Sequence, residues 1–371
     1  FQGHAVAGLR QRESLLGDMV HSRPVYVQSP SLPWPGNGPF AGYSKFRSQY
    51  DSRQAMEYVG ANDGMLHGFS ADTGEELFAY IPEFLASSAD DRGLHYLTNP
   101  GYQHRYYVDL TPVVSDVHTR GASDGFKRWR TVLVGGARTG AKGIFALDVT
   151  EPKIFADVAA DLPMWEFSST DDARMGYQLE PPKIGLADWG KGEKRWAVFL
   201  PNGYGAESPA TGLFMLDIEG GLSGTWQEGV NYRFIAFETG EGATGLSPIR
   251  QVDLDGDSII DRVYAGDLEG NLWVAAQNGQ KAWANAYKKP LLTARIDGVA
   301  QPITSPPAVI RYPERHTMVL FGTGKYLHQG DIADSTVQSF YGIFDKRAGI
   351  TRSDLARRDL TRRSLSIDGN T

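Results

Sequence analysis

The chain has 371 residues, of which 41% are hydrophobic, 11% are aromatic and 43 are glycines, and its formal net charge is -7. This length accommodates two or three average domains or one large all-β domain, and the apolar content is sufficient for a buried core. The negative charge argues against a surface that binds nucleic acid or anionic membrane, and no apolar run approaches the roughly 18 residues of a membrane span.

The two ends of the chain differ from the rest in composition. Residues 1–4 read as the remnant of a cleavable expression tag and are excluded from reasoning about the fold. Residues 347–371 form an arginine-rich C-terminal segment. Its pairs Arg357-Arg358 and Arg362-Arg363 are simplest to interpret as a solvated tail, the alternative being a role in docking a partner. The sequence therefore predicts one domain over residues 5–346.

One strand pattern occurs five times between these ends. Each unit opens with a strand that begins beside a proline, predicted at 23–27, 111–114, 181–184, 247–249 and 305–309. A second, β-branched strand follows at 57–60, 131–135, 197–201, 262–266 and 318–322. A third strand, with a small-apolar-aromatic signature, follows at 64–69, 143–148, 212–217, 270–274 and 340–345. A fourth strand is predicted at 76–80, 164–167 and 224–226.

This repetition predicts an all-β fold, a β-propeller in which each unit forms one blade. The units are spaced more widely than the about 40–50 residues that a four-stranded blade needs, so we expect insertions. A weak helical face at 82–99 and helical potential at 52–56 predict small helical insertions.

The connection between the first two strands of the fourth unit is rich in acids. Asp253, Asp255, Asp257 and Asp261 stand at positions 1, 3, 5 and 9 of a short loop. Four carboxylates so close together repel one another unless a cation lies among them. Ca²⁺ takes six to eight oxygen ligands, and acids at positions 1, 3 and 5 with a backbone carbonyl at position 7 are how calcium loops supply them. The predicted calcium ligands are therefore these four aspartates and the carbonyl of Ile259.

The loop departs from the standard EF-hand. Position 6, usually glycine, is Ser258, and position 12, usually a bidentate glutamate, is Tyr264. A strand follows the loop in place of a helix, so the sequence predicts a shortened calcium loop on a β-hairpin. The alternative is a solvated turn, since Asp and Gly are ordinary turn residues. The corresponding corners of other units, at 115–130, 187–194 and 311–316, lack four alternating acids, which favours an ion.

Other motifs indicate no catalytic site. Residues 185–191 match a phosphate-loop pattern but lack the following Ser or Thr and lead into a strand, so we interpret the match as chance. The eight histidines have no metal-ligand spacing, and we expect His21 and His67 to pack or form hydrogen bonds. We expect Trp165, Trp226 and Trp273 to pack between blades, the alternative being a sugar-binding platform. Zero cysteines exclude disulfides, zinc-thiolate sites and thiol catalysis.

Six segments carry a resemblance to a known family. They are residues 17–24, 58–69, 104–109, 263–273, 322–327 and 339–345. Over about residues 8–355 the chain resembles the C-terminal β-propeller of the PilC/PilY family of type IV pilus tip-associated biogenesis factors and adhesins. The turn at 71–74, followed by Phe78, is typical of quinoprotein-like repeats. The resemblance implies about seven blades, of which five are legible here, and a calcium ion in the loop at 253–261.

The resemblance also implies a function. It predicts a non-enzymatic, calcium-binding module that regulates type IV pilus extension and retraction, and adhesion. Its partners would be major or minor pilins and a host-cell receptor, and it would be exported to the periplasm, outer membrane or cell surface. One alternative is a passive scaffold or a carbohydrate- or receptor-binding adhesin with purely structural calcium. Another is a quinoprotein-type dehydrogenase, which is disfavoured because those enzymes typically stack their quinone against a vicinal cysteine pair.

Overall fold

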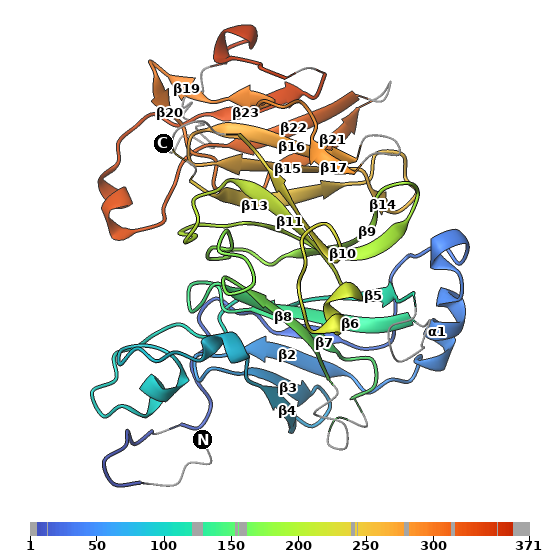
Figure 1. Cartoon of the computed structure of the whole chain (residues 1–371), viewed down its shortest axis with the longest axis vertical. Helices are drawn as coiled ribbons and strands as arrows, with labels where there is room; N and C mark the ends of the chain where they lie inside the picture. Colours follow the sequence, from blue (N-terminus) through green and yellow to red (C-terminus); the bar gives the residue numbers. More distant parts are fainter. Residues whose placement is uncertain are drawn as a thin grey trace, which may run out of the picture.

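The computed structural model describes residues 6–12, 14–120, 129–152, 155, 162–238, 242, 244–277, 282–312, 316–346 and 348–358. Residues 1–4 and the second arginine pair of the C-terminal segment lie outside this part of the chain. The described residues form five blade-like sheets of three to five strands and one two-stranded ribbon. The sheets follow one another in chain order along the long axis, from the blue first sheet at the bottom of Figure 1 to the orange last sheet at the top.

The first two sheets are four-stranded antiparallel meanders. The first contains β1 (Val25–Val27), β2 (Met56–Gly60), β3 (Leu66–Ser70) and β4 (Glu76–Tyr80) in that order. The second contains β5 (Val113–His118), β6 (Trp129–Gly136), β7 (Gly143–Asp148) and β8 (Pro163–Ser168). Their prolines precede β1 and β5, where the missing N–H donor is tolerated.

The third and fourth sheets have five strands each, and the fifth has three. The third contains β9 (Lys183–Asp188), β10 (Lys194–Pro201), β11 (Gly212–Asp217) and β12 (Tyr232–Ala236), with β14 (Ile259–Ile260) at its edge. The fourth contains β13 (Leu246–Val252), β15 (Arg262–Asp267), β16 (Asn271–Gln277), β17 (Trp283–Asn285) and β18 (Leu292–Thr293). The fifth contains β21 (Ala308–Tyr312), β22 (His316–Gly322) and β23 (Phe340–Phe344), and the ribbon is β19 (Arg295–Ile296) with β20 (Val299–Ala300). The all-β fold and the five repeated units are thus confirmed.

The core lies between successive sheets, because alternate residues of a strand point to opposite faces. In β6, Val132 and Val134 pack in the cluster shared with the third sheet, whereas Leu133 packs in the cluster shared with the first. Two further clusters join the third sheet to the fourth and the fourth to the fifth. Inner sheets are therefore buried on both faces, which explains the nearly continuous apolar runs of their strands.

The insertion at 82–99 is helical as predicted, in the form of the short 3₁₀ helices η2 (Glu83–Leu85) and η3 (Leu94–Thr98). Two other local predictions were wrong. The α-helix α1 lies at Tyr43–Gln49, and the predicted helical segment 52–56 leads into β2. The fourth strand of the third sheet is β12, because the predicted strand 224–226 instead brings Trp226 against the second sheet, where its indole N–H donates to the carbonyl of Glu166 at 2.6 Å.

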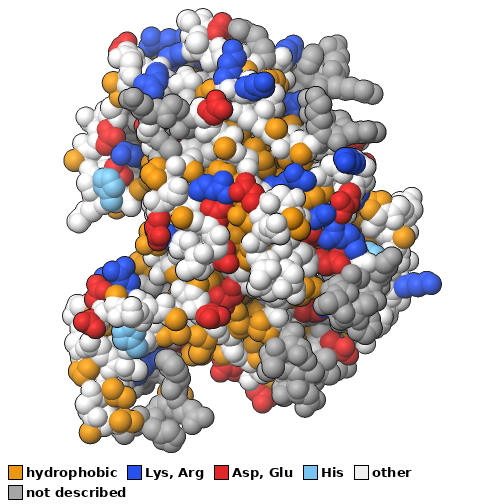
Figure 2. All heavy atoms as spheres, viewed as in Figure 1, with side chains coloured by type: hydrophobic (Ala, Val, Ile, Leu, Met, Phe, Trp, Pro, Cys, Tyr) orange, Lys and Arg blue, Asp and Glu red, His pale blue; other side chains and the backbone are white. Residues whose placement is uncertain are grey.

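The C-terminal part of the described chain lies against the last two sheets. Ile350 is 7% exposed and forms a bridge with Leu292, and Arg352 donates to Ser339 and Tyr341. Leu355 packs against the apolar cluster between the fourth and fifth sheets, to which Ile350 belongs. No helix among the described residues is long and apolar enough to cross a bilayer. Acidic and basic side chains are interspersed over the face shown in Figure 2, with no large field of one sign.

Candidate metal site in the loop between β13 and β15

The acidic loop joins β13 to β15, which are antiparallel neighbours in the fourth sheet. The N–H of Asp261 donates to the carbonyl of Val252 at 2.9 Å and closes the loop where the two strands meet. Within the loop, Ile259 and Ile260 form β14, which pairs with β9 of the third sheet. The predicted hairpin corner is therefore present, and the structure adds a strand within it.

The aspartate side chains organise the backbone of the loop. Asp253 accepts hydrogen bonds from the N–H groups of Gly256 at 2.7 Å and Ser258 at 2.8 Å. Asp261 accepts from the N–H of Leu254 at 2.6 Å, which ties the end of the loop back to its start. These local bonds are how Asp favours turns over regular structure, and they fix the direction of the carboxylates.

Two further acids bond to the backbone two residues ahead. Asp255 accepts from the N–H of Asp257 at 3.2 Å, and Asp257 accepts from the N–H of Ile259 at 2.8 Å. The chain reverses through left-handed backbone at Gly256 (φ 86°) and Ser258 (φ 68°). Ser258 thus takes the conformation that usually requires the glycine of a calcium loop.

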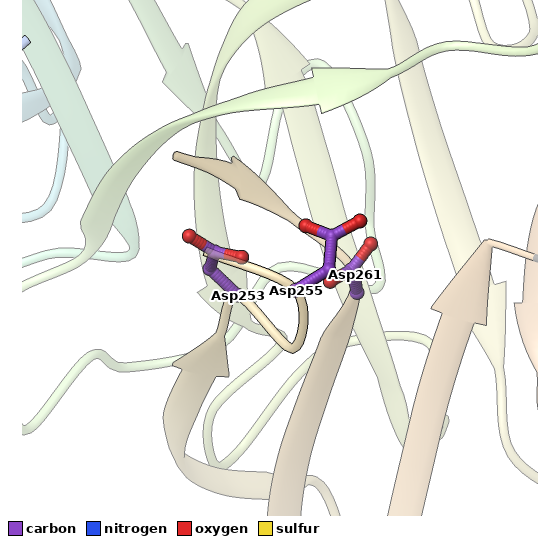
Figure 3. Close-up of side chains that lie close together, drawn as sticks. All are labelled: Asp253, Asp255 and Asp261. Carbon is purple, nitrogen blue, oxygen red and sulfur yellow. The ribbon is translucent and has the colours of Figure 1, made fainter. Parts of the chain in front are cut away.

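Three of the four predicted side-chain ligands come together. One carboxylate oxygen each of Asp253, Asp255 and Asp261 lie within 4.8 Å of one another. Figure 3 shows Asp255 and Asp261 side by side, with Asp253 where β13 ends. Asp257 is outside this group, and Ile259 is 8% exposed within β14.

The electrostatics of the loop are unfavourable without a cation. Burial raises the pKa of Asp261, the bond from Leu254 lowers it, and the charges of Asp255, Asp253 and Asp257 raise it further. Burial likewise raises the pKa of Asp257, together with the charges of Asp255 and Asp253 and against the bond from Ile259. The net upward shift of both groups reflects partial desolvation together with like-charge repulsion.

The donor set fits calcium. All three clustered ligands are carboxylate oxygens, the hard donors that Ca²⁺ takes and that softer metals such as Zn²⁺ rarely take alone. Among the described residues, backbone bonds use one oxygen each of Asp255 and Asp261, which leaves the second oxygen for an ion. Beside the loop lies a cavity of about 400 Å³, lined in part by Asp255, Asp261, Asn285 and Tyr287. Water in that cavity could complete the six to eight ligands of Ca²⁺.

A buried carboxylate next to the loop was missed by the sequence analysis. The side chain of Asp345, the residue directly after β23, is fully buried and accepts from Arg262, from Tyr264 at 2.6 Å and from Tyr287 at 2.5 Å. Arg262 directly follows Asp261, so the end of the acidic loop is tied to the fifth sheet. The sequence did contain a feature that could have indicated Asp345. The third predicted strand ends with an aspartate in several units, as at Asp148 and Asp217.

Other candidate residues have structural roles. The Nδ1 of His21 lies 2.6 Å from Asp109, and His67 lies between Asp63 and Glu76, so both histidines form hydrogen bonds as expected. The phosphate-loop match at 185–191 spans the end of β9 and a turn into β10, and therefore lacks the helix N-terminus of a nucleotide site.

The three tryptophans are largely buried. Trp165 is 6% exposed and donates to the carbonyl of Ile218, and Trp226 packs against it edge to face. Trp273 is fully buried and donates to Asp267 at 2.7 Å. These contacts agree with packing between sheets and leave the rings of Trp165 and Trp273 without the open face of a sugar platform.

Comparison with known proteins finds one family. The family model described as PilY1 beta-propeller domain matches residues 16–370. The type IV pilus biogenesis factor PilY1 of Pseudomonas aeruginosa strain UCBPP-PA14 is 36% identical over 374 aligned residues, covering 92% of this chain and 30% of that protein. A PilY1 homolog of Xylella fastidiosa is 34% identical, covering 93% of this chain and 26% of that protein.

A solved structure has the same fold. The crystal structure of the Pseudomonas aeruginosa PilY1 C-terminal domain matches with a TM-score of 0.67 and 32% identity, covering 86% of this chain and 64% of that chain. The PilY1 relatives are much longer than this chain, which spans less than a third of the length of the curated relatives that it matches.

Proposed function

The chain belongs to the PilY1 β-propeller family, and from this premise we propose that it is a non-enzymatic, calcium-binding module of a type IV pilus system. In this proposal the module is exported, associates with the pilus and meets major or minor pilins. Calcium in the loop between β13 and β15 regulates pilus extension and retraction, and a host-cell receptor is a further partner in adhesion.

The observation that carries the proposal is the convergence of Asp253, Asp255 and Asp261. Their oxygens lie within 4.8 Å of one another in a loop whose backbone is already ordered by the same side chains. Ca²⁺ would neutralise the three charges and hold the loop in this shape, with Asp257 and the carbonyl of Ile259 as the other predicted ligands. Loss of the ion would restore the repulsion and loosen the corner that joins β13 to β15.

The affinity follows from the ligand set. Because Tyr264 stands where a standard EF-hand has its bidentate glutamate, we expect a Kd on the order of 10⁻⁶–10⁻⁴ M, weaker than that of buffer-type calcium sites. Low-millimolar calcium outside the cell would keep such a site occupied. A site of this affinity would respond to calcium depletion, which is the property that a regulatory role needs.

Isothermal titration calorimetry on the purified chain tests calcium binding. We expect one site in the wild type and loss of binding, by at least about tenfold, in Asp261→Ala, which removes a clustered ligand. Asp72→Ala is the matched control, since Asp72 is an exposed acid in the turn between β3 and β4. Absence of binding by the wild type, or equal binding by Asp261→Ala, would remove the calcium site from the proposal.

Pilus retraction tests the regulatory part. A strain that carries Asp261→Ala is compared with wild type and Asp72→Ala at equal surface levels of the protein. Altered retraction or twitching in the Asp261→Ala strain alone is the expected result. Unchanged motility, with calcium binding abolished in the purified variant, would favour a passive scaffold or adhesin in which calcium is only structural.

A further inference from the structure

The acidic loop belongs to two sheets. It leaves β13 of the fourth sheet and reaches the edge of the third, where β14 pairs in parallel with β9, Ile259 opposite Leu186 and Ile260 opposite Ala187. It then returns to the fourth sheet as β15. Figure 1 shows β14 beside β9, next to the fourth sheet.

The side chains of β14 pack on the two faces of the third sheet. Ile259 is 8% exposed and belongs to the cluster that joins the second and third sheets. Ile260 packs against the cluster that joins the third and fourth sheets. Gly185 of β9 makes room for this approach, since a Cβ there would lie 2.7 Å from Cγ1 of Ile260. The fit of β14 against β9 therefore depends on the absence of a Cβ atom at position 185.

The acids stand at both ends of β14. Asp257 accepts from the N–H of Ile259, and Asp261 follows Ile260 directly and bonds back to Leu254. One conformation of the loop thus does two things. It brings the oxygens of Asp253, Asp255 and Asp261 within 4.8 Å of one another, and it places β14 where it pairs with β9. If repulsion moves the carboxylates of the loop apart, the loop changes shape, and Ile259 and Ile260 lose their pairing with β9 of the third sheet.

We infer that calcium in this loop fastens the third sheet to the fourth, because ion binding and the pairing of β14 with β9 are one coupled event. The inference rests on the calcium binding proposed above and adds what that binding controls, which is a junction between sheets as well as a hairpin. Coupling of this kind is reciprocal. A change in β9 that disturbs the pairing must weaken calcium binding, although Gly185 offers no ligand.

The first test is calcium titration of Gly185→Ala by calorimetry on the full chain. The added methyl meets Ile260, so we expect the calcium affinity to fall by at least about fivefold, the lower end of usual coupling between sites. Gly36→Ala is the matched control, since a Cβ at Gly36 has no atom within 4 Å, and its affinity should equal that of the wild type.

The second test is hydrogen exchange on the wild type with and without calcium, which does not depend on the variant folding. Calcium should slow exchange in peptides that cover 183–188 as well as in those that cover 253–262. Slower exchange at 253–262 alone, together with unchanged affinity in Gly185→Ala, would overturn the coupling and leave the calcium site standing. No calcium binding by the wild type would instead remove the proposed function, and the inference with it.

Discussion

Ser258 occupies the sixth position of the acidic loop with a φ of 68°, a conformation that costs a non-glycine residue about 1–2 kcal/mol. The only bond that involves this residue among the described ones comes from its backbone N–H, which donates to Asp253. Among the described residues, the Ser258 hydroxyl therefore forms no hydrogen bond that would offset the strain.

Replacing Ser258 with glycine should leave calcium binding equal to that of the wild type or make it tighter. Glycine adopts this φ freely, so Ser258→Gly lowers the cost of the ordered loop, partly offset by the greater entropy of glycine when the loop is loose. We expect an affinity equal to or up to about fivefold above that of the wild type, measured by calorimetry, with Ser258→Ala close to wild type. A weaker site in Ser258→Gly would mean that the hydroxyl takes part in binding.

His67 is a buried residue whose charge matters to stability. Burial alone lowers its pKa, but the bonds to Asp63 and Glu76 outweigh burial and raise the pKa above its ordinary value. The side chain is 4% exposed and stacks on Phe69, while Asp63 lies in the turn before it and Glu76 on β4. An imidazolium held between two carboxylates stabilises the first sheet.

The stabilisation by His67 should decline as the pH rises. Because the folded pKa lies above the unfolded value of about 6.5, the contribution is fully present below that pH and is lost as the pH rises through the folded pKa. Near pH 6 we expect His67→Gln to lower the unfolding free energy by about 1.5–3 kcal/mol, and by less at alkaline pH. Denaturant unfolding of both proteins across this range measures the difference, and a difference that grew with pH would contradict this assignment.

At the scale of elements, the first and fourth sheets share a corner design. In the fourth sheet, the fully buried Asp267 accepts from the N–H groups of Glu269 and Asn271 and from the indole of Trp273. In the first sheet, Asp63 accepts from the N–H of Met65 and from His67. Each aspartate thus holds the turn between the second and third strands and has a ring nitrogen of the third strand as a hydrogen-bond partner.

Removing the indole donor should destabilise the fourth sheet. Trp273→Phe keeps an aromatic ring but leaves a buried carboxylate with one bond fewer, so we expect a loss of about 2–4 kcal/mol in denaturant unfolding. Trp226→Phe is the matched control, since its indole donates to a neutral backbone carbonyl at a less buried position and should cost about 1 kcal/mol. Equal losses in the two variants would show that the charge of Asp267 is not the cause.

At the scale of the whole molecule, the sheets are held to one another mainly by the apolar clusters between them, with polar ties at the junctions. The third and fourth sheets meet at β14, and Arg262 ties the fourth to Asp345 of the fifth. A ligand that binds only the folded chain stabilises all of it by mass action. The acidic loop contacts the third, fourth and fifth sheets, so the calcium binding proposed for it should be visible in global stability.

Calcium removal should therefore lower the melting temperature. At a calcium concentration about 100-fold above Kd, binding contributes about 2.7 kcal/mol. With an unfolding entropy of about 2.1 cal/mol/K per residue, this corresponds to about 3–4 °C for a chain of this length. Scanning calorimetry with excess calcium and with chelator measures the shift, which Asp261→Ala should largely lose and Asp72→Ala should keep.

Much of the fold could be predicted because the information was local. The alternation of apolar residues and the prolines before β1 and β5 are patterns of a few neighbouring residues, and they predict the strands. The recurrence of the strand pattern along the chain predicts the sheets. The helix was misplaced because α1 is positioned by Tyr43 and Phe46 packing on Trp129, far along the chain. The strand predicted at 224–226 failed for the same reason, a contact of Trp226 with another sheet.

The sequence by itself determined the strands, their repetition and the acids of the loop, because each depends on neighbours in the chain. Only the tertiary structure decided that Asp253, Asp255 and Asp261 converge while Asp257 lies apart, and that β14 pairs with β9. It also decided that Arg262 meets Asp345. The pairing of β14 with β9 and the contact of Arg262 with Asp345 join residues from different sheets, and no local pattern specifies which distant partner a buried charge or an edge strand will find.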